Sequence, residues 1–127
     1  MSLSFVVDVD WIERLAAAHR DSGLGAVILH GAVHSYRRSE SKAWGELMGA
    51  FSMRHDAQRP LTVETVAPEH PIMRGVPEKW ATIPEELGHN TAMIADPVYR
   101  GLVTRGLLWT VDRLRNDGTP AAGYAAR

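Results

Sequence analysis

The chain has 127 residues, of which 45% are hydrophobic and 23% are charged, a composition typical of one ordinary globular domain with a modest core. Its formal net charge is -1 and its isoelectric point is about 6.6, so no strong field favours nucleic acid or an anionic membrane surface, and neither is expected as a partner. The absence of cysteine excludes disulfides, thiolate zinc sites and a cysteine nucleophile.

The start of the chain does not resemble a targeting segment. Residues 1–8 lack the basic start and the long apolar run of a signal peptide, and no run of the chain reaches the length of a membrane span. A cytoplasmic protein is therefore expected, unless the chain is a fragment that has lost a targeting sequence.

A helix is predicted over residues 11–21. Asp10 with Glu13 forms a capping-box pattern at its start. Gly23 is placed to end the helix in the left-handed conformation. The next element should therefore follow after a tight turn.

Four consecutive apolar residues lie between Gly25 and His30. Such a run is typical of a strand covered on both faces, as in a parallel sheet. Ligand sites in open α/β sheets lie at the ends of such strands. We therefore expect the polar residues after this strand to border a pocket.

The middle of the chain predicts a second helix and a second strand. Ser41 is expected to cap a helix over residues 43–51, whose two internal glycines imply close packing there. Residues 61–66 alternate in the manner of a strand, and residues 72–87 are loop-rich. The other tryptophans are expected to pack in the core or at its rim. Trp80, which lies in this loop-rich stretch, is the candidate for stacking against a sugar.

The last predicted helix covers residues 97–115 and begins at Asp96, with the acid as cap and a proline in the first turn. Residues 116–127 are poor in large apolar side chains and are predicted to be disordered, which leaves a single domain over residues 1–115. Two or three strands against three helices is too little sheet for a well-covered α/β domain.

Histidines dominate the residues that could carry chemistry. His30 and His34 share a face if the turn after the strand is helical, as two ligands of one metal ion would require. Further ligands could come from His55, Asp56, Glu69, His70, Glu86 and His89. The alternative is that the imidazoles form hydrogen bonds to the backbone at a strand–loop junction.

Charged residues offer two other candidates. Arg37, with Arg38 and Lys42 nearby, could bind a carboxylate or phosphate, or could lie in a solvated loop. Glu86 lies close to His89, and a carboxylate beside an imidazole can orient it for acid–base work. Adjacency in sequence does not by itself provide that geometry.

In their order, these motifs resemble the ThuA-like family, the trehalose-utilisation group, whose fold is similar to that of class I glutamine amidotransferases. The matching stretches are residues 25–37, 44–49, 66–75, 80–87, and 88–90 leading into 96–109. The Gly88-His89-Asn90 signature followed by a helix is the most specific of them.

The resemblance implies an α/β fold, a truncated flavodoxin-like or class I glutamine amidotransferase-like three-layer domain with a small, mostly parallel sheet. Family members usually have an additional βα region in front and further strands where Leu87 here runs straight into Gly88. The chain therefore resembles a ThuA-like domain that is N-terminally shortened and internally deleted between Leu87 and Gly88. Such a deletion would account for the shortage of strands.

In the amidotransferase-like fold, the turn after the strand predicted between Gly25 and His30 corresponds to the turn that holds the cysteine nucleophile. Here that turn reads His30-Gly31-Ala32 and has no thiol or hydroxyl, so cysteine-dependent amidotransferase activity is excluded. The resemblance implies catalytic or hydrogen-bonding roles for His30, His34, Glu86 and His89, and substrate-binding roles for Arg37, Tyr36, Asn90 and Trp80.

Three functions remain open, and the sequence does not decide whether the chain is an enzyme. The first is a ThuA-like domain of carbohydrate utilisation that binds or processes a sugar derivative. The second is a non-catalytic binding module or decayed fragment, and the third is a metal-assisted hydrolase that uses the histidines. No cofactor is expected apart from a divalent metal in the third case, and exposed sheet edges favour a homo-oligomer.

Overall fold

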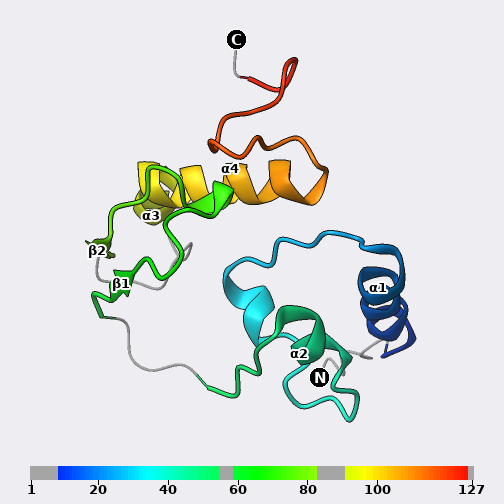
Figure 1. Cartoon of the computed structure of the whole chain (residues 1–127). Coiled ribbons are helices and arrows are strands. Elements are labelled where there is room, and N and C mark those ends of the chain that lie inside the picture. Colours follow the sequence, from blue (N-terminus) through cyan, green and yellow to red (C-terminus); the bar gives the residue numbers. More distant parts are fainter. Residues whose placement is uncertain (1–8, 55–58, 83–90, 126–127) are drawn as a thin grey trace. The chain divides into compact units, whose positions relative to one another are not determined.

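The structure, a computed structural model, describes residues 9–54, 59–82 and 91–125 (Figure 1). Its elements are α1 (Val9–Ser22), η1 (His30–His34), α2 (Ala43–Met48), β1 (Thr62–Glu64), η2 (Pro71–Met73), β2 (Lys79–Ala81), α3 (Thr91–Ala95) and α4 (Pro97–Thr110), where η marks a 3-10 helix. Within the described ranges, none of the helices combines the length and apolarity needed to cross a bilayer.

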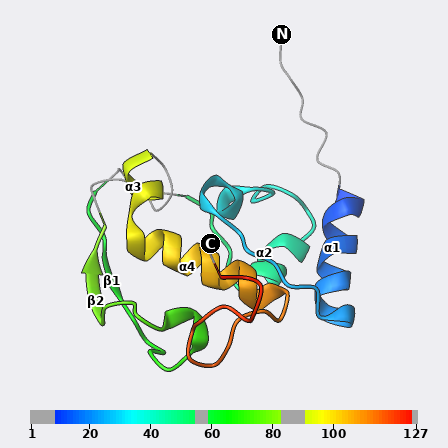
Figure 2. The same cartoon turned by 90° about the horizontal axis from the view of Figure 1, so that it is seen from above.

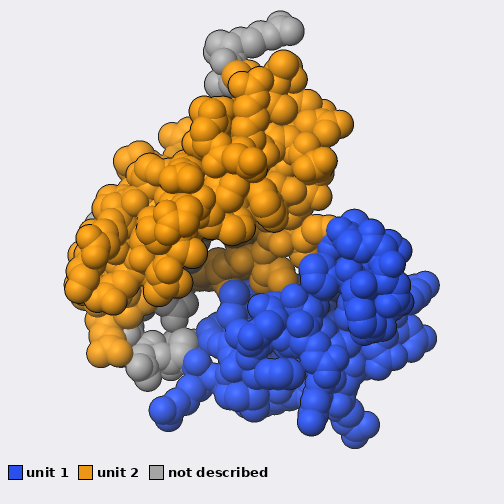
Figure 3. Space-filling model, in the orientation of Figure 1, with its two compact units in different colours: residues 1–24, 31–56 blue, residues 25–30, 57–127 orange. Residues whose placement is uncertain are grey.

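The contacts within the chain divide it into two compact units. Unit 1 comprises residues 1–24 and 31–56, and unit 2 comprises residues 25–30 and 57–127. Figure 2 gives a second view of the elements, and Figure 3 colours the two units separately.

In unit 1, α1 packs against α2. Ile12 and Ala16 lie one turn apart on α1 and are 0% and 6% exposed, and Trp44 of α2 is 9% exposed. Residues four apart share one face of a helix, so Ile12 and Ala16 form the buried face of α1. The core of this unit therefore consists of a narrow stripe of α1 and the indole of α2.

The predicted end of the first helix is confirmed. Gly23 has φ +66°, and its N–H donates to the carbonyl of His19 at 3.1 Å. This is the left-handed termination that glycine adopts without steric cost. The start is two residues earlier than predicted, because α1 begins at Val9, and Asp10 lies inside the first turn and not at the cap position.

The second helix is shorter than predicted. Gly49 has φ +70° and caps the helix after Met48, so it ends the helix and does not lie inside it. At the other end, the Ser41 hydroxyl accepts the N–H of Ala43 at 3.3 Å. The prediction that Ser41 is the cap is nevertheless wrong, because the N-cap of α2 is Lys42, whose side chain makes no capping bond, and Ser41 satisfies the first backbone donor from one position further back.

In unit 2, β1 and β2 form a two-stranded antiparallel sheet in which Val63 lies opposite Trp80. Helix α4 contacts both η2 and α3. Its predicted cap is confirmed, since the Asp96 carboxylate accepts the N–H of Tyr99 at 2.9 Å. Met93 of α3 is 1% exposed and is the most deeply buried side chain described in this unit.

The prediction of a strand between Gly25 and His30 is wrong. The residues there have no regular secondary structure, and they pack against α4 in unit 2. A side chain on Gly25 would collide with Thr110, and the methyl groups of Val27 face Gly106. The apolar run therefore packs only in part against a helix, with Val27 and Ile28 half-buried and Leu29 42% exposed, and no strand of the described residues pairs with it.

The described residues thus combine helices with one small antiparallel sheet and do not include the mostly parallel sheet that the sequence predicts. It is compatible with an α/β domain. β1 and β2 run in opposite directions, and a third strand that the sequence allows, over residues 4–7, lies outside the described residues.

The C-terminal segment is ordered through residue 125, in contrast to the predicted disorder. Leu114 pairs with Pro120 in an isolated antiparallel bridge and is 9% exposed. The N–H of Ala121 donates to the carbonyl of Arg113, whose guanidinium lies 5.6 Å from the ring centroid of Tyr124. Backbone pairing and one buried leucine hold a segment whose composition alone predicts disorder.

Candidate functional site

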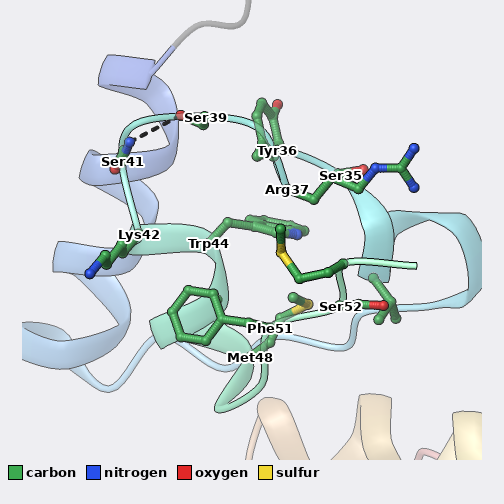
Figure 4. A pocket seen from close by; sticks show the side chains of 13 residues that line it. Ser35, Tyr36, Arg37, Ser39, Ser41, Lys42, Trp44, Met48, Phe51 and Ser52 are labelled. Atoms are coloured by element: carbon green, nitrogen blue, oxygen red, sulfur yellow. Dashed lines mark hydrogen bonds between the residues drawn. The ribbon is translucent and has the colours of Figure 1, made fainter. Parts of the chain in front are cut away.

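A cavity of about 200 Å³ lies within unit 1 and is lined by residues between Val33 and Met53 (Figure 4). Its walls come from the end of η1, the loop that follows, α2 and the segment after α2. The side chains fall into an apolar group, a group of serines and two cations at the edge.

An aromatic pair forms the centre of the site. The rings of Tyr36 and Trp44 meet edge to face, with centroids 5.4 Å apart and an interplanar angle of 64°. The indole N–H of Trp44 donates to the carbonyl of Ala32 at 2.9 Å, which fixes the ring. Tyr36 has φ +56°, a strained conformation for a residue with a side chain, and such strain persists where the surrounding structure enforces it.

Met48, Phe51 and Met53 complete the apolar wall. Phe51 lies so close to Gly45 that a side chain at position 45 would collide with its ring. The close packing predicted for the glycines of the second helix is therefore confirmed at Gly45. Phe51 and Met53 are 60% and 65% exposed, so this wall is open to solvent.

The cations lie at the edge of the cavity. Arg37 and Lys42 line it, but Figure 4 shows both charged ends directed away from the ring cluster. Arg38, their neighbour in sequence, is exposed and is not part of the lining. The interior is thus apolar, with positive charge at the rim.

Two of the lining serines have structural roles. The Ser39 hydroxyl accepts the N–H of Ser41 at 3.2 Å, a bond drawn in Figure 4, and the Ser41 hydroxyl accepts the N–H at the start of α2. Ser52 is different, because its hydroxyl lies 2.9 Å from Nδ1 of His34, 18 residues earlier in the chain. Both residues are half-buried.

The predicted site residues are distributed as follows. Tyr36 and Arg37 line the cavity, and His34 adjoins it through Ser52. His30 begins η1 with φ +48° and is assigned to unit 2. The remaining predicted residues are Trp80, which belongs to β2 of unit 2, and Glu86, His89 and Asn90, which lie outside the described residues.

Trp80 is half-buried in β2. Among the described residues, no group accepts a hydrogen bond from its indole N–H, although that nitrogen is buried. An indole N–H usually finds a partner when it is buried. The role predicted for Trp80 as a stacking residue is not tested by this environment.

The pairing predicted for His30 and His34 as metal ligands does not fit their helix. They lie in a 3-10 helix, which has about three residues per turn, so residues four apart point in directions about a third of a turn apart. Residues 9–54, 59–82 and 91–125 contain no group of three histidine, aspartate or glutamate residues that could hold an ion. His70 caps η2 by accepting the N–H of Ile72 at 3.3 Å, a structural role. His55, Asp56, Glu86 and His89 lie outside the described residues.

Sequence reasoning missed most of the apolar wall and the serine at its edge. Trp44, Met48 and Phe51 follow helical spacing, which indicates core packing rather than a cavity. No local signal connects Ser52 to His34, because only the turn at Gly49 brings the chain back toward η1.

The cavity lies inside a region with a recognisable family pattern. A family model described as ThuA, trehalose utilisation, matches residues 9–87, which is more than half of the chain. Comparisons with curated proteins and with solved structures give no match. The match ends at Leu87, the last residue before the expected deletion. It does not include residues 88–90 and 96–109, which also resemble the family in the order of their motifs. The whole cavity lies inside the matched region. Because the family model matches more than half of the chain, the chain belongs to the ThuA family.

Proposed function

We propose that this protein acts in carbohydrate utilisation by binding a sugar or sugar derivative in the cavity of unit 1. The observation that carries the proposal is the pair of Tyr36 and Trp44 at the centre of a cavity inside the family match. Aromatic rings pack against the apolar face of a sugar ring, and nearby polar groups fix its orientation.

The size of the cavity limits the ligand. Sites for drug-sized ligands occupy roughly 300–1,000 Å³. The cavity here measures about 200 Å³, so one sugar ring fits it better than a disaccharide. If the ligand is trehalose or another disaccharide, one of its rings would remain outside.

The roles of individual residues are part of the proposal. Tyr36 would contact the ring, and Arg37 at the rim would bind a polar substituent by charge-assisted hydrogen bonds. From the family resemblance alone, and apart from the cavity of unit 1, we also propose binding roles for Asn90 and Trp80 and acid–base roles for His30, Glu86 and His89. His34, which adjoins the cavity through Ser52, is proposed as a further acid–base residue. The family further supports the proposal of an amidotransferase-like arrangement with a parallel sheet, which structure determination with a bound sugar would test.

Thermal unfolding with a panel of sugars tests this function. A ligand that binds the native state raises the unfolding midpoint by mass action. Monosaccharides and their oxidised derivatives should raise it, and disaccharides should raise it less. A midpoint unchanged by every sugar at millimolar concentration would contradict the proposal.

Two matched pairs of variants locate the binding site. Arg37→Ala should weaken the binding of the best sugar by about tenfold or more, as for loss of a hydrogen bond to a charged group. Arg38→Ala, which removes an exposed cation outside the lining, should leave the affinity unchanged. Tyr36→Ala should weaken binding by about threefold to tenfold. Tyr124→Ala, at an exposed tyrosine of unit 2, serves as its control. Equal effects within either pair would place the ligand elsewhere.

A further inference from the structure

We propose that Ser52 is a nucleophile activated by His34, and that the protein transfers the acyl group of a small ester to Ser52. The inference rests on the proposed function only in taking the cavity of unit 1 as the ligand site. It assigns a reaction to that site and identifies a nucleophile outside the turn at residues 30–32.

The geometry of the pair meets the first requirement. The Ser52 hydroxyl and Nδ1 of His34 are 2.9 Å apart, within the roughly 2.6–3.2 Å that a nucleophile and its base require. When the imidazole carries its proton on Nε2, Nδ1 accepts the hydrogen bond from the serine hydroxyl. In that tautomer the bond is already oriented for removal of the hydroxyl proton.

The position of Ser52 meets the second requirement, access to a bound molecule. Ser52 lines the cavity beside Phe51 and Met53. Ser39 and Ser41 also line it, but their hydroxyl oxygens accept backbone N–H groups near the start of α2. Of these three serines, Ser52 is the one with a described hydrogen bond to an imidazole.

The described charged residues of the cavity are both cations. Attack on an ester places negative charge on the carbonyl oxygen. None of the described residues that line the cavity is a carboxylate, and Arg37 and Lys42 contribute positive charge at its rim, with their charged ends directed away from the ring cluster. The volume of about 200 Å³ and the apolar wall suit a short acyl chain such as an acetyl group.

The reaction balances without any further reagent except water. Ser52 Oγ attacks the ester carbonyl carbon while Nδ1 of His34 takes the hydroxyl proton. The tetrahedral intermediate expels the alcohol oxygen, which takes the proton back from the imidazolium and leaves an acyl group on Ser52. Water then attacks the acyl carbon while His34 takes a water proton. The bond between the acyl carbon and Ser52 Oγ breaks, Oγ takes the proton back from the imidazolium, and the carboxylic acid leaves the free serine. An acylated sugar would yield the free sugar and a short carboxylic acid.

A fluorophosphonate with a short alkyl chain is the probe for this chemistry. The Ser52 oxygen would form a bond to phosphorus, fluoride would leave, and the proton would pass to His34. The full chain is incubated with the probe, intact mass gives the number of adducts, and peptide mapping gives their position. The expected result is one adduct, on Ser52. An unmodified chain, or label spread over exposed serines such as Ser22, would overturn the inference.

Variants separate activation of Ser52 from structural effects. Ser52→Ala should abolish the adduct, and Ser22→Ala, at the exposed end of α1, should leave its rate unchanged. His34→Ala should slow labelling by about 100-fold or more, the contribution of a general base. Added free imidazole should restore label on Ser52 in His34→Ala. A purely structural hydrogen bond would not produce that rescue, so its absence in a folded variant would contradict the role of His34.

Sugar binding by calorimetry distinguishes this inference from the proposed function. If a sugar binds but Ser52 is not labelled, the nucleophile is rejected and the sugar site stands. If Ser52 is labelled and no sugar binds, the acyl-transfer site stands and the sugar proposal fails.

Discussion

Asp117 illustrates at the residue scale how one carboxylate organises the C-terminal turn. Its Oδ1 accepts two hydrogen bonds from Thr119, one from the hydroxyl at 2.6 Å and one from the backbone N–H at 2.9 Å. The side-chain bond and then the backbone bond to Thr119 lower the pKa of Asp117 below its ordinary value. The turn is therefore supported by the ionised carboxylate.

This arrangement predicts the response of the turn to acid. Because the folded pKa is depressed, the support is present above the ordinary aspartate pKa and is lost as the pH falls through the folded value. The amide shift of Thr119 in NMR spectra should titrate with a midpoint below that of an unstructured aspartate. In Thr119→Val, which removes the hydroxyl bond, the midpoint should rise. An unchanged midpoint in that variant would show that the hydroxyl does not lower the pKa.

Gly45 provides a second prediction at the residue scale. In Gly45→Ala the new methyl group would displace the ring of Phe51, which is 60% exposed and can swing into solvent. Alanine also favours the helix by about 1 kcal/mol relative to glycine, so stability in urea should change by no more than about that amount. Sugar affinity measured by calorimetry should fall because the cavity loses a wall. Gly31→Ala, where a side chain would meet nothing within 4 Å, serves as the control.

At the scale of the element, α4 depends on its first residue. Asp96 accepts the N–H of Tyr99 at 2.9 Å, and the proline that follows it occupies the first turn. Asp96→Ala should lower the free energy of unfolding by about 0.5–2 kcal/mol. Asp96→Asn keeps an acceptor and should cost much less, and urea denaturation would measure both. Equal losses would show that the negative charge at the helix start, and not the hydrogen bond, is the stabilising factor.

Helix ends were easier to predict from the sequence than the apolar run before His30. The end of α1 and the start of α4 follow the sequence because their signals are local: the Gly23 N–H donates to His19, and the Asp96 carboxylate accepts the N–H of Tyr99. The end of α4 was predicted wrongly, because the helix stops at Thr110 and not at residue 115. The apolar run before His30 carries no such signal. Its residues suit burial against a strand or against a helix equally well, and the contact with α4 decides between them.

At the scale of the whole molecule, the described residues bury few large side chains. The buried apolar side chains are Ile12, Ala16, Trp44, Met93 and Leu114. Among the large apolar side chains that remain exposed are Phe51 at 60%, Met53 at 65% and Val66 at 92%. So small a core offsets little of the conformational entropy lost on folding.

We therefore expect this protein to associate with copies of itself. Association would cover exposed apolar surface and would make stability depend on protein concentration. Light scattering should show a mass above 14.0 kDa, and the unfolding midpoint should rise with concentration. A monomer whose midpoint is independent of concentration would contradict this expectation. Val66→Ser, at the most exposed of these positions, should weaken association if its surface takes part.

The sequence by itself determined what depends on composition, on neighbouring residues or on the order of motifs. The lack of cysteine excludes a thiol nucleophile, Gly23 and Asp96 mark helix ends through hydrogen bonds within one turn, and the motif order indicates the family that the match confirms. Only the tertiary structure decided the cavity. Its defining contacts join Gly45 to Phe51 across the turn at Gly49, and His34 to Ser52 across 18 residues. Such contacts depend on the direction in which the chain turns back after α2. Local sequence patterns do not determine that direction, because it is set by contacts between residues far apart in the chain.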